Sequence, residues 1–310
     1  MSYLVEDLVE SIKTRSLAPI AQSTFDDNKL ILMADEEMQL KLVNDLIKAR
    51  EDFFLTATQV DLIGLVANYP VPSRAIGNSL KQVFWIMSGS QQRFPLKKVD
   101  AERAQDYTDP GTRPEAFYFL GDEIVLLPTP LESLGQIEFI YPARPGSLTA
   151  TVNCAKITGL SQGSGTVQFN VNTDLTGSFV VGSRIDILSA VSPFKYWSQD
   201  IAITAITSTT IEVSFTDVVN AASSIQPIVG DYICPTGSAN IPQIPIAFNP
   251  VLAQMVVVRL MESLGDINKL NAAKGTLAEM RSEASSLIRN RVENSPDKIK
   301  GRNQIGRYFR

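Results

Sequence analysis

The sequence predicts an α+β protein, built as an α-helical bundle with short β-hairpins, an inserted all-β domain and an extended C-terminal arm. Apolar residues recur at helical spacing near both ends of the chain, and short β-like runs broken by Gly and Pro lie between them. The stretch 148–240 is rich in Ser, Thr, Val, Ile and Gly and contains alternating runs typical of a sandwich or a barrel. Helical sequence resumes after this stretch, which indicates an insertion.

The chain therefore divides into three parts. We expect residues 1–147 and 241–296 to form a helical core, residues 148–240 to form the inserted β domain, and residues 297–310 to form the C-terminal arm. A length of 310 residues allows more than one compact unit, because a typical domain has roughly 100 to 200 residues. Hydrophobic residues at 44% and charged residues at 20% are typical of a folded globular protein.

The first predicted helix lies near the start of the chain, where apolar residues share one helix face. These residues are Val5, Leu8, Val9 and Ile12, and Pro19 closes the segment. A longer helix is predicted from Asp35, because carboxylates in a first turn complement the helix dipole. Its apolar positions are Met38, Leu42, Leu46, Ala49 and Phe53.

Short β-like runs follow at 82–86, 117–120, 123–127 and 136–140. Gly121 and Asp122 separate two of these runs, which predicts a hairpin turn. In the inserted domain, the runs 167–171, 185–188 and 210–215 alternate apolar and polar residues. This alternation predicts half-buried antiparallel strands.

Prolines mark the return of helical sequence, at Pro242, Pro245 and Pro250. One helix is predicted from Val251 to a stop at Gly265, and a second begins at Lys269 and ends before Pro296. The second helix carries apolar residues that step by three and four positions, as in a heptad seam. Two interpretations stay open: the last two helices pack on each other, or the seam contacts a neighbouring subunit. The seam residues are Leu270, Ala273, Leu277, Met280, Ala284 and Leu287.

The C-terminal arm differs in charge from the rest of the chain. Residues 289–310 contain seven basic and two acidic residues, whereas the whole chain has a formal net charge of −5. The arm has no apolar periodicity, but its aliphatic and aromatic residues are interleaved with basic ones, so we expect it to order by docking on a partner. A solvated terminus is the alternative. The arm residues concerned are Lys298, Ile299, Lys300, Arg302, Ile305, Arg307, Tyr308, Phe309 and Arg310.

The absence of histidine excludes several kinds of chemistry. Ser–His–Asp catalysis, Cys–His catalysis and His-ligated metals are ruled out. A carboxylate pair remains at Asp122 and Glu123, but neighbours on a turn diverge and do not flank a shared substrate. We therefore expect no enzyme activity, no metal and no cofactor.

Cysteine usage and the lack of export signals indicate an aqueous, reducing compartment. Cys154 and Cys234 form no Cys-x-x-Cys pair, so no zinc site or redox motif is indicated. We interpret both as small buried hydrophobic residues, and a disulfide stays open if they share a domain. No segment reaches the ~18 uninterrupted apolar residues that a membrane span needs, and the N-terminus lacks a signal-peptide pattern, so we expect no membrane partner.

Two features allow a binding interpretation. Arg93, Lys97 and Lys98 could form an anion patch, although we favour a solvated face. Tyr196 and Trp197, in an aromatic run, could form a ligand-binding tip, although we favour core or inter-subunit contacts.

A set of short motifs runs through the predicted core in a characteristic order. They are Tyr-Pro-Val-Pro at 69–72, Arg-Ala-Ile-Gly-Asn at 74–78, Val-Phe-Trp at 83–85, Arg-Phe-Pro-Leu at 93–96, Pro-Glu-Ala-Phe-Tyr at 114–118, Gly-Asp-Glu-Ile-Val-Leu-Leu-Pro at 121–128, Phe-Ile-Tyr at 139–141, Ala-Arg-Pro at 143–145 and Ile-Pro at 241–242. In order and spacing they resemble the head-to-tail adaptor proteins of tailed bacteriophages, also called connector or tail tubular proteins. The resemblance covers the N-terminal part and the C-terminal helices, but not the inserted β domain.

The resemblance implies a structural virion protein at the head–tail junction, assembled in the host cytoplasm. Such proteins form a homo-oligomeric, dodecameric ring under the portal protein, with a helical bundle lining a conduit through which double-stranded DNA passes transiently. The C-terminal arm would insert along the portal, and a tail nozzle or tail-completion protein would be the partner on the other side. These are expectations from the resemblance alone.

Two other functions are weighed against the adaptor. A β-module binding protein of the tail, for fibre attachment or glycan recognition, would need Tyr196 and Trp197 exposed in a groove. A hydrolase would need a carboxylate pair drawn from Asp122, Glu123 and Asp186.

Overall fold

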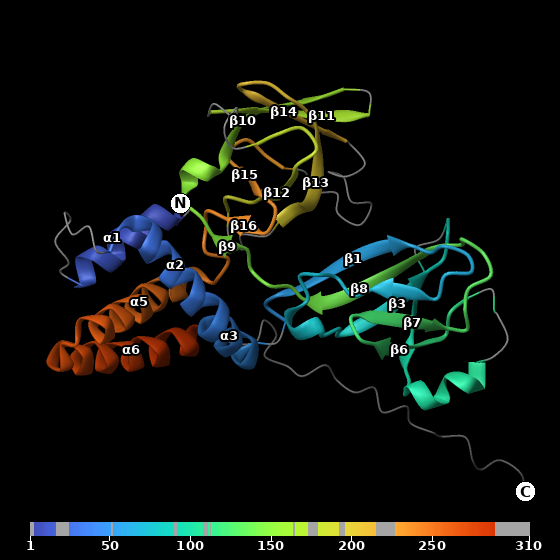
Figure 1. The fold of residues 1–310 in the computed structure, drawn as a ribbon, viewed down its shortest axis with the longest axis horizontal. Helices are drawn as coiled ribbons and strands as arrows, with labels where there is room; N and C mark the ends of the chain where they lie inside the picture. Colours follow the sequence, from blue (N-terminus) through green and yellow to red (C-terminus); the bar gives the residue numbers. More distant parts are fainter. Residues whose placement is uncertain are drawn as a thin grey trace, which may run out of the picture.

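The structure, a computed structural model, describes residues 3–16, 25–50, 52–89, 92–107, 111, 113–163, 165–172, 179–191, 196–214 and 227–288. These residues form a helical lobe, a β-sandwich and a β-barrel (Figure 1). The predicted arm at 297–310, together with Pro19 and Pro296, lies outside the described residues.

The helical lobe joins helices from both ends of the described chain. Its elements are α1 (Val5–Ser16), α2 (Asp27–Glu37), the π-helical turn η1 (Met38–Leu42), α3 (Val43–Ala49), the 3₁₀ turn η5 (Ile246–Phe248), α5 (Asn249–Leu264) and α6 (Ile267–Leu287). The predicted stripe of α1 is buried in the shared core, from Val5 to Ile12. Helices α1, α2 and α6 all pack on α5, so the N-terminal helices are completed by residues that follow the inserted domain.

The long N-terminal helix begins earlier than the sequence predicted. It starts at Asp27, because the carboxylate of Asp26 accepts a hydrogen bond from the Lys29 amide at 3.0 Å and caps the first turn. Asp35 lies inside the helix, where its carboxylate accepts a hydrogen bond from the Leu148 amide at 3.0 Å. The predicted start at Asp35 is therefore wrong, since that carboxylate serves a tertiary contact.

Helix α5 is the centre of the helical lobe. Pro250 lies in its first turn, and Gly265 ends it in the left-handed conformation at φ 70°, as the sequence predicted. The span Ile246–Leu264 is long and apolar enough to cross a bilayer, with a mean hydropathy of 1.2, yet 67% of that window is buried inside the protein. Packing within the core therefore accounts for its apolar character.

The segment that follows α3 forms a sandwich of two four-stranded sheets, ordered β1-β8-β3-β4 and β2-β7-β6-β5. The strands are β1 (Leu55–Asp61), β2 (Asn68–Pro70), β3 (Gln82–Ile86), β4 (Arg93–Pro95), β5 (Lys97–Lys98), β6 (Ala116–Leu120), β7 (Glu123–Leu127) and β8 (Gln136–Pro142), with 3₁₀ turns η2 (Ile76–Asn78) and η3 (Ala101–Tyr107). The predicted hairpin is present as β6–β7, with Gly121 at φ 63°. Both sheets contribute to one core, which includes Ile124 and Phe139. The hairpins expected on a helical bundle thus form a lobe with a core of its own.

The inserted β region is a closed barrel, one of the two architectures that the sequence left open. Its strand order is β10-β11-β14-β13-β12-β15, and every pairing is antiparallel. The strands are β10 (Ala155–Gln162), β11 (Thr166–Val171), β12 (Arg184–Leu188), β13 (Tyr196–Ile206), β14 (Thr210–Ser214) and β15 (Tyr232–Pro235). Phe169, Ile185 and Ile211 fill its interior and are fully buried.

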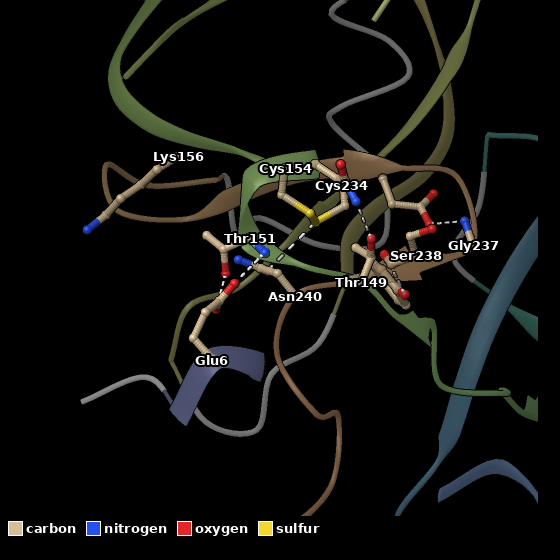
Figure 2. The surroundings of a disulfide bond; sticks show 12 residues. Glu6, Thr149, Thr151, Cys154, Lys156, Cys234, Gly237, Ser238 and Asn240 are labelled. Atoms are coloured by element: carbon tan, nitrogen blue, oxygen red, sulfur yellow. Dashed lines mark hydrogen bonds between the residues drawn. A yellow bond between two sulfur atoms is a disulfide. The ribbon is translucent and has the colours of Figure 1, made fainter. Parts of the chain in front are cut away.

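The chain enters and leaves the barrel through a parallel strand pair, β9 (Ser147–Leu148) and β16 (Ser238–Ala239). A 3₁₀ turn, η4 (Thr151–Asn153), follows β9. Cys154 follows this turn directly, and Cys234 lies on β15. Both are buried, as predicted, and they are joined in a disulfide (Figure 2). The sequence left this bond open, and the fold forms it by placing β10 beside β15.

Candidate functional site

The sandwich and the barrel meet at an ion pair between Arg74 and Asp186. Arg74 lies between β2 and η2, and Asp186 lies on barrel strand β12. The Arg74 Nη2 atom is 2.6 Å from Asp186 Oδ2, and the two side chains are 12% and 0% exposed. The pair favours this placement of the two lobes, because loss of one partner would leave an uncompensated buried charge.

Backbone amides and an aromatic ring complete this junction. The Gly237 amide donates to Asp186 Oδ2 at 2.8 Å, and the Asp200 amide donates to Asp186 Oδ1 at 2.9 Å. Asp200, at φ 58°, also places a carboxylate oxygen 3.4 Å from Arg74. The guanidinium of Arg74 lies 5.0 Å from the centre of the Tyr196 ring, within reach of a cation–π contact.

Burial and neighbouring charges shift the pKa values of these groups. It raises the pKa of the Asp186 carboxyl above its ordinary value, while Arg74 and the two amides act against that rise. Burial, and after it the Asp186 carboxylate, raises the pKa of the Tyr196 hydroxyl. For Arg74, burial acts to lower the pKa, but Asp186 opposes it and the pKa ends above its ordinary value. A charged Arg74 and a neutral Tyr196 at neutral pH suit a structural joint.

A pocket of about 100 Å³ lies beside the junction, where the three lobes meet. Phe53 and Phe54 line it from the turn after α3, Arg144 and Pro145 from the segment after β8, and Tyr196 from the barrel. Phe53, predicted on the preceding helix, lies in this turn. Sites for small-molecule ligands usually have a volume of about 300–1,000 Å³. This pocket is smaller than that and has room for a single side chain.

The end of the sandwich that points away from the other lobes carries apolar loops (Figure 1). We call it the sandwich tip and define it as loops 62–67, 87–89 and 128–135. Glu132 is the single charged residue in these loops. Exposed apolar clusters of this kind mark contact sites for other proteins. The exposed hydrophobic residues of the sandwich tip are Ile63, Leu65, Val66, Met87, Leu131 and Leu134.

Hydrogen bonds between the loops hold the sandwich tip in shape. The Leu65 amide donates to the backbone carbonyl oxygen of Pro130 at 2.8 Å, and the Gly64 amide donates to the Ser133 hydroxyl at 2.9 Å. Leu65 is 74% exposed and has φ 63°, a left-handed conformation that costs a leucine roughly 1–3 kcal/mol. An exposed leucine held in an unfavourable backbone conformation favours a role in contact with another molecule.

A family model described as SU10 adaptor protein matches residues 5–161. The chain belongs to the SU10 adaptor protein family. It is a structural adaptor protein of phage and a component of the virion, in agreement with the resemblance of its motifs. Among curated proteins, none matches the chain.

The family match divides the adaptor at the barrel. It covers α1 to α3, the whole sandwich and all but the last residue of β10, and it ends before the other barrel strands and helices α5 and α6. Arg74 and the sandwich tip lie inside the matched segment, whereas Asp186 lies outside it. The junction therefore connects the family's part of the adaptor to the barrel.

The predicted seam of the adaptor faces its own helical core. Ala273 and Ala284 are buried there at 9% and 5% exposed, and the Gln254 side chain on α5 donates to the Ala273 carbonyl oxygen at 3.2 Å. The partly buried members are Leu270, Leu277 and Met280. Each of these positions thus takes part in the packing of the helical lobe, and a contact of the seam with a neighbouring subunit stays a prediction. Leu287, at 71% exposed, is the seam residue that faces outward.

The basic residues considered as an anion patch make contacts within the chain. Arg93 forms an ion pair with the buried carboxylate of Glu138 at 3.2 Å. The Lys98 ammonium lies 5.0 Å from the centre of the Phe119 ring. Lys97 is exposed on β5. The three residues thus lie on two strands, and Arg93 and Lys98 engage different neighbours.

Tyr196 and Trp197 both make contacts within the chain. Trp197 packs against the barrel core and donates its indole N–H to the buried Asp231 at 2.5 Å. Tyr196 packs at the junction under Arg74. Tyr196 lines the small pocket beside the junction and Trp197 does not, so the two rings do not share the groove that a glycan-binding tip built on them would need.

The candidate carboxylates also have structural partners. Asp122 accepts a hydrogen bond from the Asn78 amide group at 2.6 Å, and Glu123 accepts one from Asn68 at 2.9 Å. Asp186 is the buried partner of Arg74. Asp122 and Glu123 lie in the sandwich and Asp186 lies in the barrel, and each carboxylate is engaged by a different partner.

Neither the Arg74–Asp186 pair nor the sandwich tip was predicted from the sequence. Arg74 belongs to the motif at 74–78, but its partner is 112 positions away. The tip has a local signal, because the runs 62–67 and 128–135 combine apolar residues with Gly and Pro. Loops run over the protein surface, so apolar residues in turn-forming sequence indicate exposed apolar side chains.

Proposed function

We propose that this adaptor forms a homo-oligomeric ring that joins the portal protein to the tail at the head–tail junction. The observation that carries the proposal is the family match over residues 5–161. In this proposal the ring is dodecameric, is assembled in the host cytoplasm, encloses the path of double-stranded DNA, and performs no catalysis.

The sandwich tip supports a role in contacts. Its loops are tied together by hydrogen bonds and carry several exposed hydrophobic side chains with a single charge. A rigid apolar surface binds another protein at a low cost in ordering. We assign the tip to the tail side of the ring, towards a tail nozzle or tail-completion protein.

The C-terminal arm supports contact with the portal. Residues 298–310 combine basic side chains with Ile299, Ile305, Tyr308 and Phe309, so the arm offers both charge and apolar anchors. An extended segment of this composition gains its order on the surface that it binds. We therefore assign the arm to the portal side of the ring.

The test is the mass of complexes formed with the cognate portal. The full chain is expected to join the portal as a ring, and a variant that lacks residues 297–310 is expected to fail. Leu65→Asp is the matched control, because it alters the tip and leaves the arm unchanged; it should still join the portal but lose the tail-side partner. If the full chain and the truncated chain both ignore the portal, the ring proposal is overturned.

A further inference from the structure

The disulfide closes the barrel where the chain enters and leaves it, a region that we call the neck and define as residues 147–154 and 234–240. Cys154 lies just before β10 and Cys234 lies on β15, so the bond spans 80 positions and encloses every barrel strand between them. The Cα atoms are 4.5 Å apart. The two residues are the sole cysteines of the sequence, so no other thiol of the chain competes for either one.

The neck is also the place where the barrel is fastened to the helical lobe. Glu6 of α1 accepts hydrogen bonds from the Thr151 amide at 2.7 Å and from the Thr151 hydroxyl at 2.6 Å (Figure 2). The Val5 amide donates to the Asn240 carbonyl oxygen at 2.9 Å. The Asn240 side-chain oxygen lies 3.7 Å from the Cys234 sulfur. The bond therefore joins the segment that enters the barrel to the segment that leaves it, and α1 forms hydrogen bonds with both segments.

The sulfur atoms lie in a small apolar core of their own. Cys154 is 3% exposed and Cys234 is 0% exposed. Their buried neighbours are Leu188, Tyr232, Ala239 and Ile241. A dissolved thiol or disulfide reaches such sulfur atoms when the neck opens, so a bond once formed here is protected from exchange.

We propose that this disulfide is an oxidation-dependent clasp, open while the chain is in a reducing cytoplasm and closed in the released particle. Its timing rests on the proposed virion role, whereas the clasp itself does not. When the clasp is open, the neck is held by the short β9–β16 pair and by the hydrogen bonds to α1. When it is closed, loop closure stabilises the barrel by limiting its unfolded state.

The oxidant is a low-molecular-weight disulfide. The Cys154 thiolate attacks one sulfur of that disulfide, which forms a mixed disulfide and releases one small thiol. The Cys234 thiolate then attacks the Cys154 sulfur and releases the second small thiol. Each cysteine loses a proton, the two protein thiols are oxidised to one disulfide, and the small disulfide is reduced to two thiols.

The first experiment uses the full chain, purified in reductant and then treated with oxidised glutathione. Alkylation after denaturation should label two thiols before treatment and none after it. The melting temperature of the barrel should rise by about 10 °C on oxidation. The double variant Cys154→Ala/Cys234→Ala is the control, and its melting temperature should not respond to the oxidant. Two thiols that remain free after treatment, or equal melting of both forms, would overturn the clasp.

The second experiment tests the timing. Infected cells and purified particles are opened in the presence of an alkylating agent, and the thiols of the chain are counted by mass. Two alkylated thiols in the cell and a disulfide in the particle are expected. Free thiols in the particle, or a disulfide already formed in the cell, would overturn the timing. Absence of the chain from particles would instead defeat the proposed function and leave the result on the isolated chain intact.

Discussion

The sandwich and the barrel are both β lobes, but the sheets of the sandwich are open and the sheet of the barrel is closed. The barrel closes through β10 and β15 and leaves no free edge, whereas the sandwich keeps β1, β4, β2 and β5 at its margins. The barrel is bounded by a disulfide, and the sandwich ends in the apolar tip. The sandwich lies within the adaptor-family match, and nearly all of the barrel lies outside it. The family match therefore covers the lobe with open strand edges and an exposed apolar tip, whereas most of the closed barrel lies outside it.

The largest expected effect separates the two cores. Phe169 in the barrel and Phe139 in the sandwich are both fully buried, so truncation of either to alanine should cost its own lobe about 3–5 kcal/mol. Hydrogen exchange followed by mass spectrometry reports the stability of each lobe in the same sample. Phe169→Ala should loosen the barrel and spare the sandwich, and Phe139→Ala should do the reverse. Equal loosening of both lobes by either variant would mean that they unfold as one unit.

The next effect concerns the joint between the lobes. Arg74→Ala would leave the Asp186 carboxylate buried without its partner and should lower the free energy of unfolding by about 3 kcal/mol. Urea denaturation measures this loss. The double variant Arg74→Met/Asp186→Leu should recover most of it, because both charges are then removed. A double variant as unstable as Arg74→Ala would show that the pair is not what joins the lobes.

A smaller effect tests the sandwich tip. Asparagine tolerates the left-handed conformation that Leu65 adopts at φ 63°, so Leu65→Asn should raise the free energy of unfolding by about 1 kcal/mol. Leu131→Asn removes a comparable exposed side chain without that backbone conformation and should change stability by less than about 0.5 kcal/mol. Equal responses of the two variants in chemical denaturation would argue against strain at Leu65.

The smallest effect is a pH dependence at the contact between α2 and the neck. Burial raises the pKa of the Asp35 carboxyl, although hydrogen bonds from Leu148, Gln39 and Ser147 act against the rise. The folded chain therefore binds this proton more tightly than the unfolded chain, so the stability that Asp35 contributes is present at low pH and is lost as pH rises through the folded pKa. The stability of the natural chain relative to Asp35→Asn should fall as pH rises above about 4, the ordinary pKa of an aspartate. Parallel stability curves for the two proteins over that range would contradict the shift.

Several local features could be predicted from the sequence alone. The stripe of α1, the end of α5 at Gly265 and the hairpin at Gly121 each depend on residues within one or two turns of chain. The start of the long helix was predicted too late, because the cap at Asp26 competes with an acidic run at Asp35 that looks like a first turn. The docking arm and the contact of the predicted α6 seam with a neighbouring subunit stay predictions.

The rest depends on which distant strands pair. The runs at 82–86 and 136–140 were predicted as strands, but their alignment as β3 and β8, with Val83 opposite Phe139, makes them part of a sandwich with its own core. Local alternation of apolar residues predicts a strand and one buried face, and it does not name the neighbouring strand. For the same reason the Arg74–Asp186 pair could not be predicted, because its two residues lie 112 positions apart in the chain.

By itself, the sequence determined the α+β class, the inserted β region, the basic arm and the motifs of the adaptor family, because periodicity, composition and short motifs are properties of neighbouring residues. The tertiary structure decided the closed barrel, the Arg74–Asp186 joint and the Cys154–Cys234 bond. Each of these needs groups that are far apart in the chain to meet at a few ångströms. Such meetings follow from strand register and lobe packing, which no single stretch of the chain carries.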